Sequence, residues 1–310
     1  VVGIVIIGGI VWIARVTSFL VPFMCAGYML AAVTVLIVNV GEIPSSIGLI
    51  FKEAFSGSAA AGGVIGAIIQ GIKRGVFSNE AGVGSAPIAH SAVKTDRPAS
   101  EGLVALLEPF IDTVIVCTMT ALVIISSGMW NVKADAINQL DIVTAPESQS
   151  IVSTVESGTK FNLTGNESEQ GTKWLEVQVF KEDVTGWVKS DDIKMRGGDG
   201  IWLTSEAFAT VISWFPYLLS IAVILFAFST LISWSYYAEQ AVIYLFGKRN
   251  DVIISFKFIY CLFIILGAAA SLGNVIRLAD ALFFCMVVPN LIGVYFLLKV
   301  VKKELSSYLD

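Results

Sequence analysis

Seven long apolar runs are the feature that most limits what this sequence can fold into. Six of them reach the roughly 20 residues that a helix needs to cross a bilayer. The run at residues 1–14 would span only about 21 Å, so we expect it to be the remainder of a helix that starts upstream. The runs cover residues 1–14, 19–39, 46–72, 105–128, 207–238, 253–273 and 278–299. They predict an all-α polytopic protein in a lipid bilayer, in agreement with 55% hydrophobic residues, 15% charged residues and a mean hydropathy of +0.78.

The remaining composition excludes several functional classes. Residues 131–204 contain 7 Lys/Arg and 12 Asp/Glu, whereas the rest of the chain is neutral overall. The chain therefore lacks the basic footprint of a nucleic-acid partner. It has a single His, and its four Cys lie in apolar runs. We therefore expect neither an enzyme nor an organic cofactor, because no nucleophile–base or metal-ligand motif is present.

Lys and Arg between the runs predict the orientation. The connections after the first, third, fifth and seventh runs carry eleven of these residues. The opposite side carries Lys52 and Arg277 besides the polar segment 131–204, which is left out of the count because long polar domains cross the membrane regardless of charge. Because positive loops stay in the cytoplasm, we expect the eleven there. The polar segment 131–204 would then be extracellular and the C-terminus cytoplasmic.

The third run contains a break in its hydrophobic pattern. Residues 56–63 read SGSAAAGG, and glycine disfavours a helix by about 1 kcal/mol relative to alanine. A Gly-interrupted apolar segment is the best sequence indication of a transporter binding site. The alternative is close packing of an intact helix through its small residues.

Hydroxyl groups lie on one predicted face of the fifth run. Phe226, Ser229 and Thr230 follow helical spacing, and such oxygens suit a hard cation such as Na⁺. The alternative is that the hydroxyls bond back to carbonyls of the preceding turn. Trp234, one turn beyond Thr230, would close over a small substrate or simply pack.

Carboxylates near the runs have structural interpretations as well. Glu108 and Asp112 fall in the first turns of the fourth run, where acids favour a helix N-terminus. Asp280 is placed to pair with Arg277. The segment 75–87 is dense in turn residues and is either a tight loop or a gate.

The polar segment predicts short strands at 151–155, 160–163, 174–180 and 186–189, separated by turn residues. This pattern favours a small β-barrel. The stretch ESGTKF at 156–161, Trp174 and GWV at 186–188 resemble a bacterial SH3-like domain. Such a domain would be a passive cap, or would bind cell-wall peptide or glycan or regulate an outer gate.

Several ordered motifs outside that segment resemble the sodium:alanine symporter family. They are VPFM (21–24), AFSG (54–57) with GG (62–63), GVFSNEAGVGSAPIAH (75–90), FIDT (110–113), FAFST (226–230) with Trp234 and YY (236–237), and PNL (289–291). The resemblance implies a LeuT-like inverted-repeat fold of the amino acid–polyamine–organocation (APC) superfamily, truncated at its N-terminus. It divides the chain into a core at 1–130 (helices four to seven), an extracellular SH3-like domain at 138–196, and a core with a cytoplasmic tail at 201–310 (helices eight to ten).

The resemblance also implies a function, namely sodium-coupled symport of alanine or glycine across the bacterial cytoplasmic membrane by alternating access. It assigns substrate binding to Phe55, Ser56, Gly57 and Trp234. It assigns Na⁺ binding to Phe226, Ser229 and Thr230. It assigns a structural or gating role to Ser78, Asn79 and Glu80. The alternatives are a symporter for another small amino acid, or a non-transporting receptor that senses cell-wall ligands.

Overall fold

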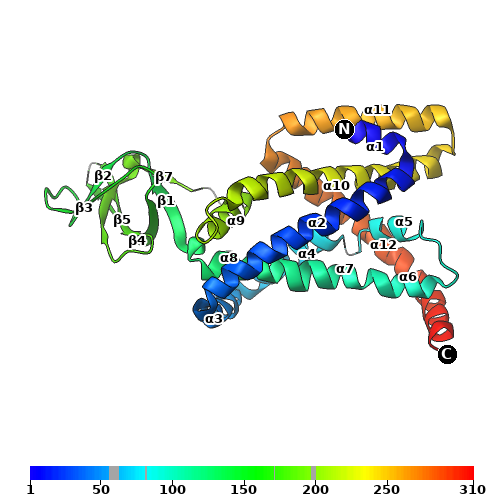
Figure 1. Ribbon diagram of the computed structural model, residues 1–310, viewed down its shortest axis with the longest axis horizontal. Coiled ribbons are helices and arrows are strands. Elements are labelled where there is room, and N and C mark those ends of the chain that lie inside the picture. Colours follow the sequence, from blue (N-terminus) through cyan, green and yellow to red (C-terminus); the bar gives the residue numbers. More distant parts are fainter. Residues whose placement is uncertain (56–62, 81, 171, 197–199) are drawn as a thin grey trace. The chain divides into compact units, whose positions relative to one another are not determined.

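The computed structural model describes residues 1–310 except 56–62, 81, 171 and 197–199. These residues form two compact units (Figure 1). The helical unit consists of Val1–Val33, Ile47–Thr120 and Tyr217–Asp310, and the sheet unit consists of Thr34–Ser46 and Ala121–Pro216.

Helices make up most of the chain. The long helices are α2 (Gly9–Val38), α4 (Gly63–Asn79), α10 (Phe215–Phe246), α11 (Asn250–Ala269) and α12 (Leu272–Leu309). The shorter ones are α1 (Val2–Ile7), α3 (Ile43–Ala54), α5 (Ser85–His90), α6 (Pro98–Ala105), α7 (Leu107–Pro109), α8 (Thr118–Ser126) and α9 (Gly200–Ala209). The segment η3 (Phe110–Cys117) is π-helical, and η1 (Val40–Glu42), η4 (Met129–Asn131) and η5 (Ser190–Asp192) are short 3-10 turns.

The prediction of seven membrane spans is wrong for the described residues. Five stretches there are long and apolar enough to cross a bilayer, and these are Gly9–Val38, Pro98–Ser126, Phe215–Phe246, Asn250–Ala269 and Gly273–Leu309. The first two predicted runs are not separated at Arg15, because helix α2 continues through this residue. The hydroxyls of Thr17 and Ser18 donate to the carbonyls of Ile13 and Arg15 at 3.0 and 3.1 Å, so these polar residues are satisfied inside the helix.

Two described helices cover parts of the third predicted run. Helix α3 ends at Ala54 and α4 begins at Gly63. The Gly/Ser segment lies outside the described residues, so the predicted break stays a prediction. The LeuT-like inverted repeat is also not shown by the described helices, which differ from the prediction in their number of spans.

One apolar cluster of the helical unit joins α1, α2, α10 and α11. Ile6 and Ile232 are fully buried in it, and Val5 and Ile13 are buried beside them. Helix α1, marked by the N-terminus in Figure 1, lies along α11. Lys257 of α11 donates to the carbonyl oxygen of Ile6 at 2.8 Å and pairs with Glu239 of α10 at 3.2 Å. The Lys257 ammonium thus satisfies the C-terminal end of α1, where backbone carbonyls lack helical partners.

The sheet unit contains one antiparallel sheet. Its strands are β1 (Val132–Ala136), β2 (Leu140–Val143), β3 (Ile151–Val155), β4 (Lys160–Gln170), β5 (Thr172–Val179), β6 (Thr185–Lys189) and β7 (Ile193–Met195), in the spatial order β3-β2-β6-β5-β4-β1-β7. Among the described residues, β3 and β7 are the two edges and do not pair, so the predicted closed SH3-like barrel is wrong. Residue alternation specifies which face of a strand is buried, and it carries no information on whether the sheet closes.

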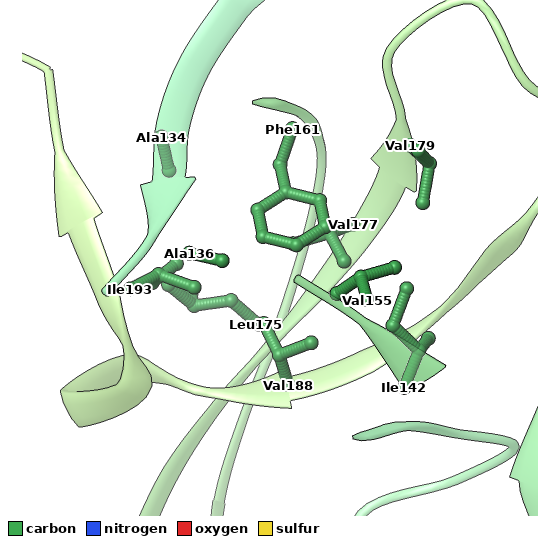
Figure 2. Close-up of a cluster of buried hydrophobic side chains, with 10 residues drawn as sticks. All are labelled: Ala134, Ala136, Ile142, Val155, Phe161, Leu175, Val177, Val179, Val188 and Ile193. Carbon is green, nitrogen blue, oxygen red and sulfur yellow. The ribbon is translucent and has the colours of Figure 1, made fainter. Parts of the chain in front are cut away.

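The core of the sheet comes from alternate residues of these strands, as Figure 2 shows. Phe161 of β4, Val177 of β5 and Ile142 of β2 are fully buried there. Charged contacts link the sheet to α9, because Lys160 pairs with Glu206. Arg196, which follows β7, binds Asp135 of β1, and its guanidinium lies 3.7 Å from the ring centroid of Trp202.

Candidate functional site

A cavity of about 930 Å³ lies among four long helices of the helical unit and η3. Its lining residues are Gly71, Arg74, Gly75, Phe77 and Ser78 of α4, Glu80 just beyond it, Thr113 and Cys117 of η3, Thr230, Leu231, Trp234 and Ala238 of α10, Tyr260 of α11 and Phe283 of α12. Besides two glycines, the lining has seven apolar or aromatic residues, two charged residues and three Ser or Thr hydroxyls. Pockets for small organic ligands have this composition.

Glu80 is the acidic group of this cavity, and it is held by two donors. The indole Nε1 of Trp234 donates to its Oε1 at 2.9 Å, and the Ser85 hydroxyl donates to Oε2. Its backbone has φ of 54°, an uncommon conformation for a residue other than glycine. Glu80 lies outside the five spans, and burial raises its pKa above the ordinary value, with the Glu108 carboxylate adding to the effect and the two donors opposing it.

The residues just before Glu80 are tied to the π-helical segment η3. The Ser78 hydroxyl donates to Asp112, and the Asn79 amide donates to the Thr113 hydroxyl at 3.0 Å. Short π-helical insertions occur frequently at functional sites. Here η3 supplies both Thr113 and Cys117 to the cavity lining and Asp112 to the end of α4.

Trp234 also contacts two other aromatic rings. The ring centroid of Trp234 lies 5.6 Å from that of Tyr237 and 5.3 Å from that of Phe283. Phe283 in turn lies 5.1 Å from Phe77 of α4. These rings link α4, α10 and α12 around the cavity, at separations typical of stabilising aromatic pairs.

A second charged contact joins α4 to α12. Lys73 pairs with Asp280 at 2.6 Å, and Asp280 is buried. The structure therefore corrects the prediction that Asp280 pairs with Arg277, which lies exposed on the same helix. The neighbouring Arg74 lines the cavity, so a positive and a negative side chain, Arg74 and Glu80, both border it.

The predicted Na⁺ residues lie together on α10 but differ in their surroundings. Thr230 lines the cavity. Ser229 is buried and donates to the carbonyl oxygen of Phe226 at 2.9 Å, which is the back-bonding that the alternative interpretation expected, here to residue i−3. Phe226 itself is 40% exposed, and its carbonyl oxygen is the acceptor in this contact.

The predicted substrate residues are divided. Trp234 lines the cavity, whereas Phe55, which follows α3, does not and is 69% exposed. Ser56 and Gly57 lie outside the described residues. Of the predicted gating residues, Ser78 and Glu80 line the cavity, and Asn79 holds η3 beside it.

Sequence reasoning missed several lining residues, namely Arg74, Thr113, Cys117, Tyr260 and Phe283. For the lining residues of α4 and η3, helical spacing in the sequence could have shown that they share one face. Gly71, Arg74 and Ser78 follow it on α4, and Thr113 and Cys117 are four residues apart. No local signal relates Tyr260 or Phe283 to the other helices.

The comparisons with known proteins identify one family. The sodium:alanine symporter family matches residues 1–158 and 184–310. The chain is 34% identical over 305 residues to the sodium/alanine symporter AgcS of Methanococcus maripaludis, covering 98% of this chain and 54% of that protein. It is 44% identical over 133 residues to the putative sodium/proton-dependent alanine carrier protein YrbD of Bacillus subtilis, covering 43% of this chain and 28% of that protein.

A third relative carries a different substrate in its name. The chain is 29% identical over 308 residues to the probable sodium/glutamine symporter GlnT of Bacillus subtilis, covering 99% of this chain and 51% of that protein. The chain thus spans about half the length of the relatives that it matches over its whole extent.

Proposed function

The chain belongs to the sodium:alanine symporter family, and from this premise we propose that it serves the symport of a small neutral amino acid, alanine or glycine, with Na⁺. Relatives named for alanine transport with sodium, or with sodium and protons, support this substrate class. Five apolar helices support a multi-pass membrane location. We further propose that the membrane is the plasma membrane, that residues 138–196 form an extracellular domain between cores at 1–130 and 201–310, and that the C-terminus is cytoplasmic.

The observation that carries the proposal is that the cavity is bordered by one positive side chain, Arg74, and one negative side chain, Glu80. An amino acid at neutral pH is a zwitterion, so its carboxylate suits Arg74 and its ammonium suits Glu80. Trp234 of α10 donates a hydrogen bond to Glu80 at the end of α4, so it connects the two helices. Its ring also offers an apolar surface for a methyl-sized side chain. Phe55, Ser56 and Gly57 remain proposed substrate contacts.

The proposed Na⁺ site uses oxygens of α10. Thr230 offers a hydroxyl oxygen at the cavity, while Ser229 and the Phe226 carbonyl lie one turn apart on the same helix. A hard cation prefers such neutral oxygens. Because the Ser229 hydroxyl donates its proton to the Phe226 carbonyl, the lone pairs of the Ser229 oxygen remain free to bind a cation.

We propose that the gate is the Glu80 cluster, defined as Glu80, Ser85 and Trp234. Alternating access requires contacts that form in one state and break in the other. The Glu80 cluster joins the end of α4 to α10 through the Trp234 indole and to α5 through the Ser85 hydroxyl, and Ser78 and Asn79 anchor the same end to η3. Its opening would free the ammonium-binding carboxylate.

The experiment that tests the Na⁺ site compares two threonines. In proteoliposomes, Thr230→Ala should raise the Na⁺ concentration for half-maximal alanine uptake by about tenfold, because one ligand to a charged group is lost. Thr17→Ala is the control, since it removes a helical threonine hydroxyl of α2 that does not line the cavity. An unchanged Na⁺ requirement in Thr230→Ala would remove Thr230 from the site.

The substrate itself is tested by competition. Unlabelled alanine or glycine should reduce labelled alanine uptake at concentrations where glutamine does not. Competition by glutamine at equal concentration would instead favour the substrate named for the GlnT relative.

A further inference from the structure

A group of ionisable side chains lies where helix α5 contacts the beginning of the span Pro98–Ser126. His90 is the last residue of α5, and its Nδ1 lies 2.6 Å from Oε1 of Glu101 on α6. Its Nε2 lies 3.8 Å from Oε2 of Glu108 on α7, which is an ion-pair separation rather than a hydrogen bond. His90, Glu101 and Glu108 are called the His90 cluster below. None of the three is among the residues that line the cavity.

The geometry of the His90 cluster follows from the spacing of its residues. Glu101 and Glu108 are seven residues apart, so two helical turns bring both carboxylates to one face of the span. Each nitrogen of the His90 ring faces one of these carboxylates. A neutral imidazole has a single N–H and can donate to only one of them, whereas a protonated ring is a donor at both nitrogens. Histidine is also the side chain that ordinarily gains or loses a proton near neutral pH.

The other charged residues beside α5 do not pair with the His90 cluster in the described part of the chain. Lys94, Asp96 and Arg97 lie in the connection between α5 and α6, where all three are exposed. The side chains of His90 and Glu101 are 28% and 19% exposed, so water reaches both of them. Protons therefore exchange between the His90 cluster and solvent directly.

Two links connect the His90 cluster to Glu80. Ser85, the first residue of α5, donates to the Glu80 carboxylate, and His90 is the last residue of the same six-residue helix. The negative charge of Glu108 also acts on Glu80 and contributes to its raised pKa. Tyr237 of α10 is a further titratable group that interacts with both of these carboxylates. The position of α5 and the charge at Glu108 thus both act on Glu80.

We propose that the His90 cluster is a proton-binding site that controls the gate, an inference that rests on the proposed role of the Glu80 cluster. A protonated His90 bridges Glu101 and Glu108 and holds α5 against the span. The Ser85 bond to Glu80 then stays in place. Loss of the proton removes the ion pair with Glu108, so α5 is held less firmly and the gate opens more readily. The proton acts here as a regulator that binds outside the cavity, and uptake is slower at low pH.

The first test measures alanine uptake at about pH 6 and about pH 8, on either side of the range in which histidines titrate. Proteoliposomes hold the protein expressed from its complete gene, with equal pH on both sides and a fixed inward Na⁺ gradient. A partly exposed ion pair changes an equilibrium by about two- to fivefold, so uptake should be higher by about this factor at the higher pH.

Matched variants assign the pH dependence to the His90 cluster. In His90→Gln, which keeps a neutral side-chain donor, the ratio of the two uptake rates should fall close to one. Glu108→Gln removes the ion pair but keeps the contact with Glu101, and it should lower the ratio in the same direction. Asp96→Asn, at an exposed acid outside the cluster, should keep the ratio of the parent protein. An unchanged ratio in His90→Gln would overturn the proposal.

A second measurement does not depend on transport. Hydrogen exchange in detergent reports on the amides of Ser91, Ala92 and Val93, which donate to carbonyls of α5. After correction for intrinsic exchange, their protection should fall by about two- to fivefold from the lower to the higher pH in the parent protein and stay constant in His90→Gln. Such a fall in protein that takes up no alanine would support the proton site and contradict the transport proposal. Protection that is independent of pH in the parent protein would overturn the proton site even if uptake occurs.

Discussion

Glu80 receives hydrogen bonds from two different parts of the chain. Ser85 is close in sequence, but Trp234 is 154 residues away, so no local pattern could have predicted their contact. The sequence motifs assigned Glu80 and Trp234 to two separate segments, one expected to gate and the other to bind substrate, and these roles stay predictions. Their meeting depends on how α4 packs against α10, and helix spacing alone does not specify that packing.

Removing the indole donor should weaken substrate handling. Trp234→Phe keeps an aromatic ring but deletes the bond to the Glu80 carboxylate, and a hydrogen bond to a charged group contributes about 1.5–3 kcal/mol. We expect the kcat/KM of alanine uptake in proteoliposomes to fall by about tenfold or more. Trp214→Phe, at an exposed tryptophan, serves as the control. Equal kcat/KM values in the two variants would contradict the role of this bond.

Glu80 should also make stability depend on pH. Burial raises its pKa above the 4.5 of an unfolded chain, so the folded protein holds the Glu80 proton more tightly than the unfolded protein. Stability from this group should therefore be present at low pH and be lost as pH rises from 4.5 through the raised pKa. Thermal unfolding in detergent across this range should have a smaller acid-side gain in Glu80→Gln. The exposed Glu182→Gln should behave like the parent protein.

At the scale of elements, the contacts of α12 with α4 and with the segment before α5 illustrate what sequence patterns miss. Sequence patterns correctly predicted helix at 278–299, whereas they suggested a tight loop or a gate from residue 75, where helix α4 continues to Asn79. They also suggested the pairing of Asp280 with Arg277, because only neighbours on one helix are visible in a sequence. The observed partner is Lys73 of another helix, which the burial of Asp280 requires.

Breaking that pair should destabilise the helical unit. Lys73→Met leaves Asp280 buried without its charge partner, and we expect a loss of about 2–4 kcal/mol, because Lys73 itself is partly exposed. Arg277→Met on the exposed side should change stability by less than about 0.5 kcal/mol. Denaturation in mixed micelles measures both, and equal losses would show that the Lys73–Asp280 contact is not stabilising.

The turn before α5 supplies a second test at this scale. Gly84 has φ of 92°, and a Cβ there would lie 2.8 Å from Oδ1 of Asn290, whose amide donates to the Gly82 carbonyl at 2.8 Å. Gly84→Ala should therefore displace Asn290 and lower stability by about 1–3 kcal/mol. Gly293→Ala, at an open helical position of α12, should be neutral or stabilising by up to about 1 kcal/mol. A neutral Gly84→Ala variant would contradict the close approach of Asn290.

At the scale of the whole molecule, the sequence correctly predicted both helices and strands, but it did not predict the number of membrane spans or all of the strands. It predicted apolar helices around a polar β segment, and the strand at 151–155 agrees with β3 residue for residue. It did not predict the short strands β1, β2 and β7, of which β2 and β7 lie within the predicted domain at 138–196 and β1 lies before it. It also predicted too many spans, because the polar residues 15–18 suggested the end of a helix. In the structure the hydroxyls of Thr17 and Ser18 bond to carbonyls of the preceding turn, and the helix continues.

The proposed membrane arrangement is tested by labelling in intact cells. Ser157→Cys in the sheet unit should react with a membrane-impermeant maleimide added outside, and Ser306→Cys near the C-terminus should react only after the cells are opened. Both positions are exposed in the structure. Labelling of Ser306→Cys from outside would reverse the proposed orientation.

The central claim is coupled transport, and one measurement tests it most directly. The protein expressed from its complete gene is reconstituted in proteoliposomes, and labelled alanine uptake is compared under an inward Na⁺ gradient and a matched K⁺ gradient. The account predicts accumulation above equilibrium with Na⁺ and only equilibration, or no uptake, with K⁺. Equal accumulation under both cations would contradict sodium coupling, and absence of uptake by verified, correctly folded protein would contradict alanine symport.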